Sequence, residues 1–251
     1  MKIGITERGD AALDFAWYDK LNTVSGAILI TKGITDDFIE KVLSAYNDGH
    51  KLIVHATCTG WGQSVVEPNV PPYPTQLSQL QKLIQKGFPI EQCVLRIDPI
   101  FPTKNGLKRV CKLLDMAFDM KLLPKMRVRI SVLDEYPHVK QRFKELGFAP
   151  IYGSSFYAPK SMMDDVCNTL SRYDIQFHTC AEPYLNRPDG LFVHSGCVSE
   201  IDLRILGLEL DPNMKTNMQN RNGCLCLSCK TELLNHKHPC KHQCRYCYWK
   251  S

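Results

Sequence analysis

Residues 27–57 read AILITKGITDDFIEKVLSAYNDGHKLIVHAT, and this stretch decides the fold. Two apolar runs, Ala27–Ile30 and Leu52–Thr57, have the continuous hydrophobic character of strands that are covered on both faces of a sheet. Between them, Asp36–Tyr46 places apolar residues at helical spacing. A strand, a helix and a strand in this order predict one parallel β/α unit.

The same alternation continues on both sides of this stretch and predicts an α/β fold, a partial or complete parallel (β/α) barrel. A doubly wound open sheet is the alternative, but no G-x-G-x-x-G motif follows the first predicted strand. We expect a single domain over residues 1–251, with the main β/α units in residues 1–175 and a cysteine-rich segment in residues 176–251 that completes the barrel. The other predicted strands are Lys2–Ile5, Val94–Ile97, Val128–Val132 and Ile175–Thr179, and the other predicted helices are Gln76–Ile84, Leu107–Phe118, Val139–Leu146 and Ser161–Tyr173.

Composition narrows the class of protein only a little. A net charge of +5 over 251 residues permits a nucleic-acid partner without requiring one. No apolar run approaches the roughly 18 residues that span a bilayer, and the first ten residues lack the apolar stretch of a signal peptide. We therefore expect a soluble, cytoplasmic protein with no membrane partner.

Polar side chains stand where a barrel would place its functional residues, at the carboxyl ends of the strands. Because these ends meet at one rim, we expect the side chains to converge there. They are Thr6, Arg8 and Asp10 after the first strand, Thr31 and Lys32 after the second, Thr59 after the third, Arg96 and Asp98 at the fourth, and Glu182 after the strand that ends at Thr179.

The twelve cysteines fall into two groups. Eight crowd into the final third of the chain, which packing alone does not explain. Among them, Cys240, Cys244 and Cys247 form a C-x-x-x-C-x-x-C array with Tyr246 just before the last cysteine. Three thiolates at this spacing can hold three irons of a [4Fe-4S] cluster and leave the fourth iron open. The other four cysteines stand singly and are expected to be buried apolar residues: Cys58, Cys93, Cys111 and Cys167.

The array resembles the defining motif of the radical S-adenosylmethionine superfamily, including the aromatic residue before the third cysteine. The segments ILITKG (Ile28–Gly33) and LRIDPI (Leu95–Ile100) resemble two strands of its spore photoproduct lyase branch. In that branch the cysteine loop comes near the start of the chain, whereas here it comes at the end. The resemblance implies a circularly permuted barrel, in which the moved strand is about Lys230–Leu234 and leads through Asn235–Pro239 into a C-terminal iron-sulfur segment.

This resemblance also implies an activity. The [4Fe-4S] cluster would bind S-adenosyl-L-methionine at its open iron and cleave it reductively to a 5′-deoxyadenosyl radical, which abstracts hydrogen from a C–H bond. A small reductant protein such as a flavodoxin or ferredoxin would supply the electron. By the same resemblance, Tyr246 packs near the adenine. The other implied site residues are Lys32, Arg96 and Asp98 as catalytic groups, and Thr6, Arg8 and Asp10 as cofactor-binding groups.

One implied feature departs from the pattern of the family, whose N-terminal segment is usually Ser-Arg-Arg-Thr-Asp-like. This chain has Thr6-Glu7-Arg8-Gly9-Asp10, so the arginine and the aspartate stand in an altered context.

A nucleic-acid base or nucleotide is the first substrate that the resemblance implies, while peptide modification and a small-metabolite rearrangement stay open. The groups that would serve such a substrate are the basic residues Arg127, Arg129, Lys140 and Arg142 and the stacking residues Trp61, Tyr73 and Tyr136.

The other late cysteines predict a second metal site. Cys180, Cys197, Cys224 and Cys226 can complete an all-cysteine [4Fe-4S] site of auxiliary or electron-transfer type, with Cys229 as an alternative ligand. Zinc competes for these thiols. Two further hypotheses remain, a zinc-stabilised binding module and a non-catalytic iron-sulfur protein for electron transfer, sensing or nucleic-acid binding. The non-catalytic protein predicts a fourth ligand on the terminal cluster, for which His242 and His238 are candidates.

Overall fold

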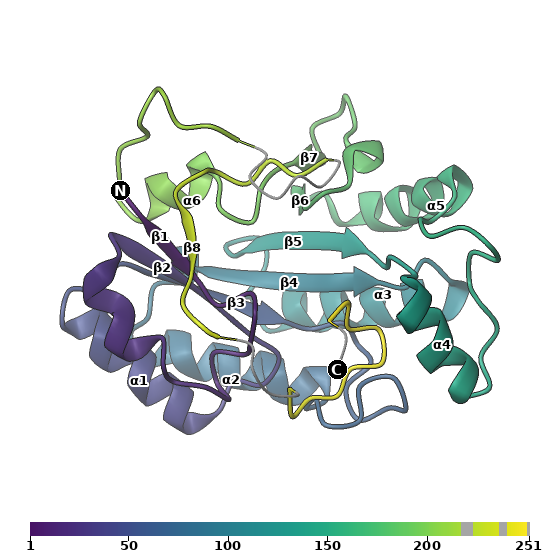
Figure 1. Ribbon diagram of the computed structural model, residues 1–251, viewed down its shortest axis with the longest axis horizontal. Coiled ribbons are helices and arrows are strands. Elements are labelled where there is room, and N and C mark those ends of the chain that lie inside the picture. The colour runs from purple at the N-terminus through teal and green to yellow at the C-terminus, as the bar shows by residue number, and fades with distance from the viewer. Residues whose placement is uncertain (217–222, 236–239, 250–251) are drawn as a thin grey trace.

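The sheet is the centre of the computed structural model, which describes residues 1–216, 223–235 and 240–249. Its described strands are all parallel to their neighbours and lie in the order β7-β6-β5-β4-β3-β2-β1-β8 (Figure 1). The strands are β1 (Ile3–Ile5), β2 (Gly26–Thr31), β3 (Leu52–Thr57), β4 (Cys93–Ile100), β5 (Arg127–Val132), β6 (Phe177–Thr179), β7 (Phe192–His194) and β8 (Lys230–Glu232).

Helices separate most of these strands along the chain, and α1, α2 and α3 cover one face of the sheet (Figure 1). Their starts are encoded locally: the hydroxyl of Thr35 accepts from Phe38 N in α1, and that of Thr103 accepts from Gly106 N in α3. The α-helices are α1 (Asp36–Asn47), α2 (Tyr73–Gln85), α3 (Lys104–Asp119), α4 (Pro137–Glu145), α5 (Lys160–Leu170) and α6 (Glu200–Ile205), and the 3-10 helices are η1 (Tyr18–Thr23), η2 (Ile90–Gln92), η3 (Ser171–Tyr173) and η4 (Pro183–Leu185).

The strand order confirms the expected α/β fold with a parallel sheet. From β1 to β7 the order in space follows the order in the chain, as in a β/α barrel. A doubly wound sheet would reverse direction part-way. Within the described residues no pairing joins β7 to β8, so the ring of strands is open at that point.

The last strand lies beside the first. β8 pairs with β1 in parallel, with Ile3 opposite Lys230 and Ile5 opposite Glu232. The Glu232 carboxylate continues the contact, because it accepts from the backbone N–H of Glu7 at 3.1 Å. Figure 1 shows the yellow β8 alongside the purple β1. The strand expected at 230–234 is therefore present over its first three residues and adjoins the N-terminal strand as expected.

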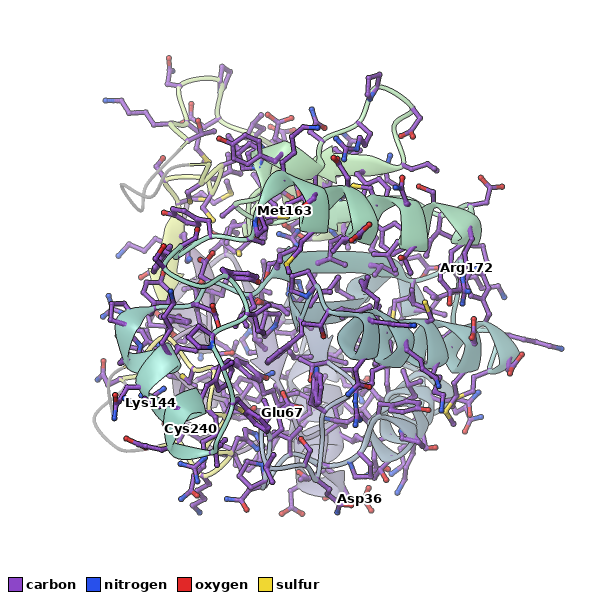
Figure 2. All side chains as sticks on the ribbon, turned by 90° about the vertical axis from the view of Figure 1, so that its right-hand side faces the viewer. Asp36, Glu67, Lys144, Met163, Arg172 and Cys240 are labelled. Atoms are coloured by element: carbon purple, nitrogen blue, oxygen red, sulfur yellow. The ribbon has the colours of Figure 1, made fainter. Side chains whose placement is uncertain are left out.

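The sheet separates two cores, because successive side chains of a strand point to opposite faces. Leu29, Val54 and Leu95 pack with the helices, and burial of each such side chain contributes about 1.5–3 kcal/mol. Ile28 and Ile53 point to the inner face and pack there with several of the late cysteines. Figure 2 shows the molecule from the right-hand side of Figure 1, with Met163 labelled on α5. Helix α5 packs against α3.

The differences from the predicted elements have local causes. β7 was not predicted, since three residues give no readable period, and β6 begins at Phe177 because Ile175 lies before the pairing with β5. The helix predicted through Tyr173 changes to a 3-10 turn after Leu170. Asp98 lies inside β4, which continues to Ile100. None of the helices in the described ranges is long and apolar enough to cross a membrane.

Candidate functional site

The C-terminal cysteine loop, residues 240–249, lies against the segment that follows β3. Arg245 N donates to the Val66 carbonyl at 2.9 Å, and Asn69 Nδ2 donates to the Lys241 carbonyl at 2.8 Å. Figure 2 labels Cys240 in this region. These two hydrogen bonds hold the loop against that segment without the help of a metal.

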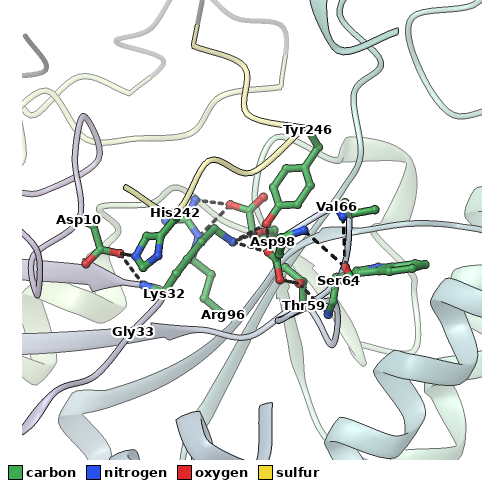
Figure 3. A network of polar contacts seen from close by, with 12 residues as sticks. Asp10, Lys32, Gly33, Thr59, Ser64, Val66, Arg96, Asp98, His242 and Tyr246 are labelled. Atoms are coloured by element: carbon green, nitrogen blue, oxygen red, sulfur yellow. Dashed lines mark hydrogen bonds and ion pairs between the residues drawn. The ribbon is translucent and has the colours of Figure 1, made fainter. Parts of the chain in front are cut away.

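His242 ties the same loop to the ends of β1 and β2. Its Nε2 lies 2.9 Å from Asp10 Oδ2, and its Nδ1 lies 3.3 Å from the Asn69 carbonyl (Figure 3). Asp10 also accepts from Thr31 Oγ1 and from the backbone N–H of Lys32, both at 2.7 Å. Both ring nitrogens of His242 are therefore engaged within the protein.

Lys32 is the centre of a second network (Figure 3). Its Nζ donates to the Tyr246 hydroxyl at 2.6 Å, to Glu67 Oε1 at 3.2 Å and to the Asp98 carbonyl at 3.4 Å. Glu67 also accepts from the Tyr246 hydroxyl and, at 2.7 Å, from Thr59 Oγ1. The side chains come from the ends of β2, β3 and β4 and from the cysteine loop, so the predicted rim exists.

The charges of this Lys32 network follow from its burial. Burial alone lowers the pKa of Lys32, but the Glu67 carboxylate reverses this and holds that pKa above its ordinary value. Burial and Glu67 together raise the pKa of Tyr246 well above its ordinary value. At neutral pH Lys32 is therefore an ammonium and Tyr246 a neutral phenol. Burial also raises the pKa of Cys244 to about 12, and Lys32 opposes that rise.

Arg96 and Asp98 form an ion pair on the inner face of β4. Arg96 Nε donates to Asp98 Oδ2 at 2.8 Å, and the Ser131 hydroxyl donates to the other carboxylate oxygen. Burial alone raises the pKa of Asp98, but Arg96 outweighs it, so that pKa lies below its ordinary value. The pair is charged at neutral pH and lies next to Lys32, whose ammonium contacts the Asp98 carbonyl.

The second cysteine group gathers around the ends of β6 and β7. Cys180 Sγ lies 2.9 Å from Cys197 Sγ, and Cys197 N donates to Cys226 Sγ at 3.2 Å. This approach depends on Gly196, because a Cβ there would lie 2.4 Å from the Leu225 carbonyl oxygen. Sequence segments almost 30 residues apart thus bring three thiols together.

The remaining two late cysteines occupy different surroundings. Cys224 is buried in the same apolar cluster as Cys197 and Cys226. Cys229 also packs in that cluster, but its carbonyl accepts from Ile3 N at 2.8 Å, beside the amino end of β1. Burial raises the pKa of Cys229, and the N-terminal amino group opposes the rise. Both cysteines therefore pack in the cluster that holds Cys197 and Cys226, and the backbone of Cys229 is also tied to β1.

The donor sets fit metal–thiolate centres, although no three Cys, His, Asp or Glu side chains of the described residues already stand in ligand geometry. Burial, with the nearby guanidinium of Arg129, holds the pKa of His55 well below its ordinary value. Neither ring nitrogen of this neutral, buried His55 has a hydrogen-bond partner, and Ser195 Oγ and Arg129 Nε also lack one. Buried donors of this kind need acceptors, and the sulfurs of a metal–thiolate centre would supply them.

The sequence matches the family described as Domain of unknown function (DUF1848) over residues 18–249. The chain belongs to this family. No match was found among curated proteins.

Two solved structures resemble the DUF1848 chain weakly. A triazine hydrolase variant shares 13% identity and a TM-score of 0.37, with 77% of this chain and 45% of that chain covered. A class V chitinase from Pseudomonas fluorescens Pf-5 shares 12% identity and a TM-score of 0.35, with 72% and 53% covered. The DUF1848 chain spans about half the length of these proteins.

The basic residues that the sequence offered to a nucleic acid do not form an exposed face in this DUF1848 protein. Arg129 is 1% exposed, and Arg127 pairs with Asp202 at 2.9 Å on the inner face of the sheet. Arg142 donates to the Cys247 carbonyl at 2.6 Å and so holds the cysteine loop. Lys140 is half-buried, and its Nζ donates to backbone carbonyls at 2.6 and 2.8 Å.

Two of the three proposed stacking residues are engaged as well. The Trp61 ring packs against Phe101, with centroids 5.1 Å apart, and lies under the Arg109 guanidinium at 4.2 Å. Tyr136 meets Phe156 edge to face at 4.4 Å. These contacts use the ring faces or edges that a base would otherwise occupy.

The residues predicted to bind the cofactor fall into different places. Tyr246 and Asp10 lie in the site, as described above. Thr6 is buried and its hydroxyl accepts from Ile30 N at 2.8 Å, which joins β1 to β2. Arg8 is exposed, and its backbone N–H donates to Glu232 at 3.0 Å. Sequence reasoning missed Glu67, which lies in a loop with no periodic signal.

Asp10 gives a testable pH dependence. Burial alone raises the pKa of Asp10, but the hydrogen bond and charge of His242, with Thr31 and Lys32, bring it below the ordinary 3.8. A carboxyl whose folded pKa is depressed stabilises the fold above its unfolded pKa, and the contribution is lost as pH falls through the folded value. We expect Asp10→Asn to lower the free energy of unfolding by about 1–3 kcal/mol near neutral pH.

That difference between the two proteins should begin to shrink below the ordinary pKa of 3.8, where Asp10 of the unfolded wild-type chain takes up a proton, and should be lost as the pH falls through the lower folded value. Urea unfolding of both proteins across this range measures it. A difference that stays constant down to about pH 3 would show that the ionisation of Asp10 contributes nothing.

Proposed function

We propose that this DUF1848 protein is a radical S-adenosylmethionine enzyme whose cluster ligands are Cys240, Cys244 and Cys247. The observation that carries the proposal is the position of His242. A non-catalytic cluster needs a fourth protein ligand, and His242 is the candidate inside the loop. Its nitrogens instead face Asp10 and Asn69 at 2.9 and 3.3 Å. The other candidate, His238, lies outside the described residues.

The three loop thiols support the proposal because they influence one another. Charge on Cys247 raises the pKa of Cys240, and charge on Cys240 raises that of Cys244, although burial is the larger cause in both. The described side chains hold no three ligands already in metal-binding geometry, so a cluster would draw these thiols together. When bound, a [4Fe-4S] cluster with an open iron supplies the electron that cleaves the sulfonium of S-adenosylmethionine.

The protein's own groups would bind and orient the cofactor beside that loop. Lys32 is held by Glu67 and hydrogen-bonds the Tyr246 hydroxyl, so it fixes the ring that would pack near the adenine. The half-buried Arg96–Asp98 pair offers both signs of charge to the amino acid part of S-adenosylmethionine.

The pairing of β8 with β1 supports the proposed circular permutation. In an unpermuted barrel the cysteine loop would follow the first strand, next to the second strand. Here it follows β8, whose neighbour is β1, and it reaches the ends of β1 and β2 through Asp10 and Lys32. The second cysteine group would hold an auxiliary [4Fe-4S] cluster through Cys180, Cys197, Cys224 and Cys226.

Anaerobic reconstitution with iron and sulfide tests the proposed function. The protein should bind about eight irons, as two four-iron clusters. After reduction with dithionite it should convert S-adenosylmethionine to 5′-deoxyadenosine. Cys244→Ala should lose that product, because one of the three ligands is gone. Cys111→Ala is the matched control, since this thiol lies in α3 away from both groups and should leave both readouts unchanged.

Two results would contradict the proposal. Zinc in place of iron after reconstitution would favour a binding module. Clusters whose spectrum does not respond to S-adenosylmethionine, and which yield no 5′-deoxyadenosine, would favour an electron-transfer or sensing protein.

A further inference from the structure

The inner face of the sheet carries a row of basic side chains. Arg96 on β4, Arg129 on β5 and His178 on β6 are successive partners in the strand register. Side chains at paired positions of neighbouring strands point to the same face. The row leads directly to the second cysteine group, because Cys180 lies two residues beyond His178 and on the same side of the chain.

Arg129 is the member of this row whose hydrogen bonds are least complete. Its side chain is 1% exposed, and one terminal nitrogen donates to the Gly196 carbonyl. The other terminal nitrogen lies 3.5 Å from Asp202, and neither it nor Nε has a hydrogen-bond partner. Buried donors without acceptors cost about 1–3 kcal/mol each, more when charged. The guanidinium is therefore held in place by Gly196, while Nε and the second terminal nitrogen still lack an acceptor.

The charges around Arg129 are also unbalanced. Arg127 and Arg129 share the single carboxylate of Asp202, at 2.9 and 3.5 Å. The positive charge that Asp202 does not balance faces the thiols. Cys197 and Cys180 interact electrostatically with both Arg129 and Arg96. An anionic group at the cysteines would restore the balance.

We propose that Arg129, assisted by Arg96, is the counter-charge of an anionic metal–thiolate centre at Cys180, Cys197 and Cys226. The inference rests on the proposed function only in taking this centre to be an iron-sulfur cluster. The Arg129 N–H groups donate to the sulfurs, and the guanidinium stabilises the more negative, reduced state. One electron from a low-potential reductant enters the cluster and no proton moves, since arginine is already protonated. Arg129 therefore raises the reduction potential of this cluster.

A full-length chain with Cys240→Ala, Cys244→Ala and Cys247→Ala isolates the second group for the test. Co²⁺ is the probe, because its thiolate charge-transfer absorption reports binding without any catalytic activity. Arg129→Met should weaken Co²⁺ binding about tenfold or more. After iron-sulfur reconstitution it should also lower the reduction potential of the remaining cluster. Arg129→Lys, which keeps the charge, should retain most of both properties.

Arg127→Met is the matched control. Arg127 lies two residues away on the same strand face and pairs with the same Asp202, but the guanidiniums that most affect the pKa of Cys180 and Cys197 are those of Arg96 and Arg129. This variant should change the Co²⁺ affinity by no more than about twofold. It should shift the reduction potential of the cluster only slightly. Equal effects of Arg127→Met and Arg129→Met would overturn the proposal, since both would then act through Asp202.

Folding is checked separately so that the result stays decisive. Circular dichroism and urea unfolding identify a variant that fails to fold. Arg129→Gln then replaces Arg129→Met, because its amide can still donate to the Gly196 carbonyl without the charge. Wild-type affinity and potential in this variant would also contradict the inference. Absence of 5′-deoxyadenosine in the unaltered protein would refute the proposed function but leave the Co²⁺ result standing.

Discussion

Asp202→Asn is expected to lower the free energy of unfolding by about 3–5 kcal/mol, because it leaves two buried guanidiniums without a counter-ion. The Asp202 carboxylate is fully buried and contacts Arg127 and Arg129. It also accepts from the backbone N–H and hydroxyl of Ser199, at 2.9 and 2.7 Å, and so caps α6. Removing its charge therefore weakens β5 and α6 together.

Urea unfolding of the wild-type and variant proteins measures this loss. Asp164→Asn is the control, since Asp164 pairs with Lys160 and Arg187 at the surface, where solvent screens the charges. Its unfolding midpoint should hardly move. A comparably small change for Asp202→Asn would mean that the two arginines find other partners or reach water.

Lys32→Met is expected to have the second largest effect, a loss of about 3 kcal/mol in the free energy of unfolding. It leaves the Glu67 carboxylate, 1% exposed, beside Tyr246 with no cation. Glu67→Leu should have a similar cost, because it leaves the Lys32 ammonium unpaired. The double variant should lose at least about 1 kcal/mol less than the sum of the two single losses, because it removes both charges.

The same three variants separate stability from activity. The double variant recovers stability but lacks the ammonium that holds the Tyr246 hydroxyl, so 5′-deoxyadenosine formation should stay abolished in it. Additive losses of stability would show that Lys32 and Glu67 do not act as a pair. Activity regained with stability would show that Lys32 serves only the fold.

Local patterns were sufficient for most of the fold. The strand Leu52–Thr57 matches its prediction at both ends, because a continuous apolar run between a glycine turn and polar loop residues has few other solutions. β7 could not be predicted, since its three residues are a strand only through their pairing with β6. The pairing of β8 with β1 was expected from the family resemblance and not from any local signal.

The site residues that stand at strand ends could be predicted from the sequence. Asp10, Lys32 and Asp98 share a rim because parallel strands end at one edge. Glu67 was missed because its loop is positioned by contacts such as that between Arg245 and Val66, which no local pattern encodes. Arg129 was offered to a nucleic-acid substrate, although the alternation of RVRISV in β5 already placed its charges on one face of a buried strand.

The contact between β1 and β8 gives this chain a particular order of assembly. A ribosome makes β1 long before it makes the partner for the open edge of that strand, since Glu7 and Glu232 meet across 225 positions of sequence. Until then β1 presents unpaired N–H and C=O groups to any other strand nearby. Contacts so distant in sequence also form slowly. A nascent chain that stalls before residue 230 would therefore expose this edge, and the cell must protect it from aggregation until synthesis is finished.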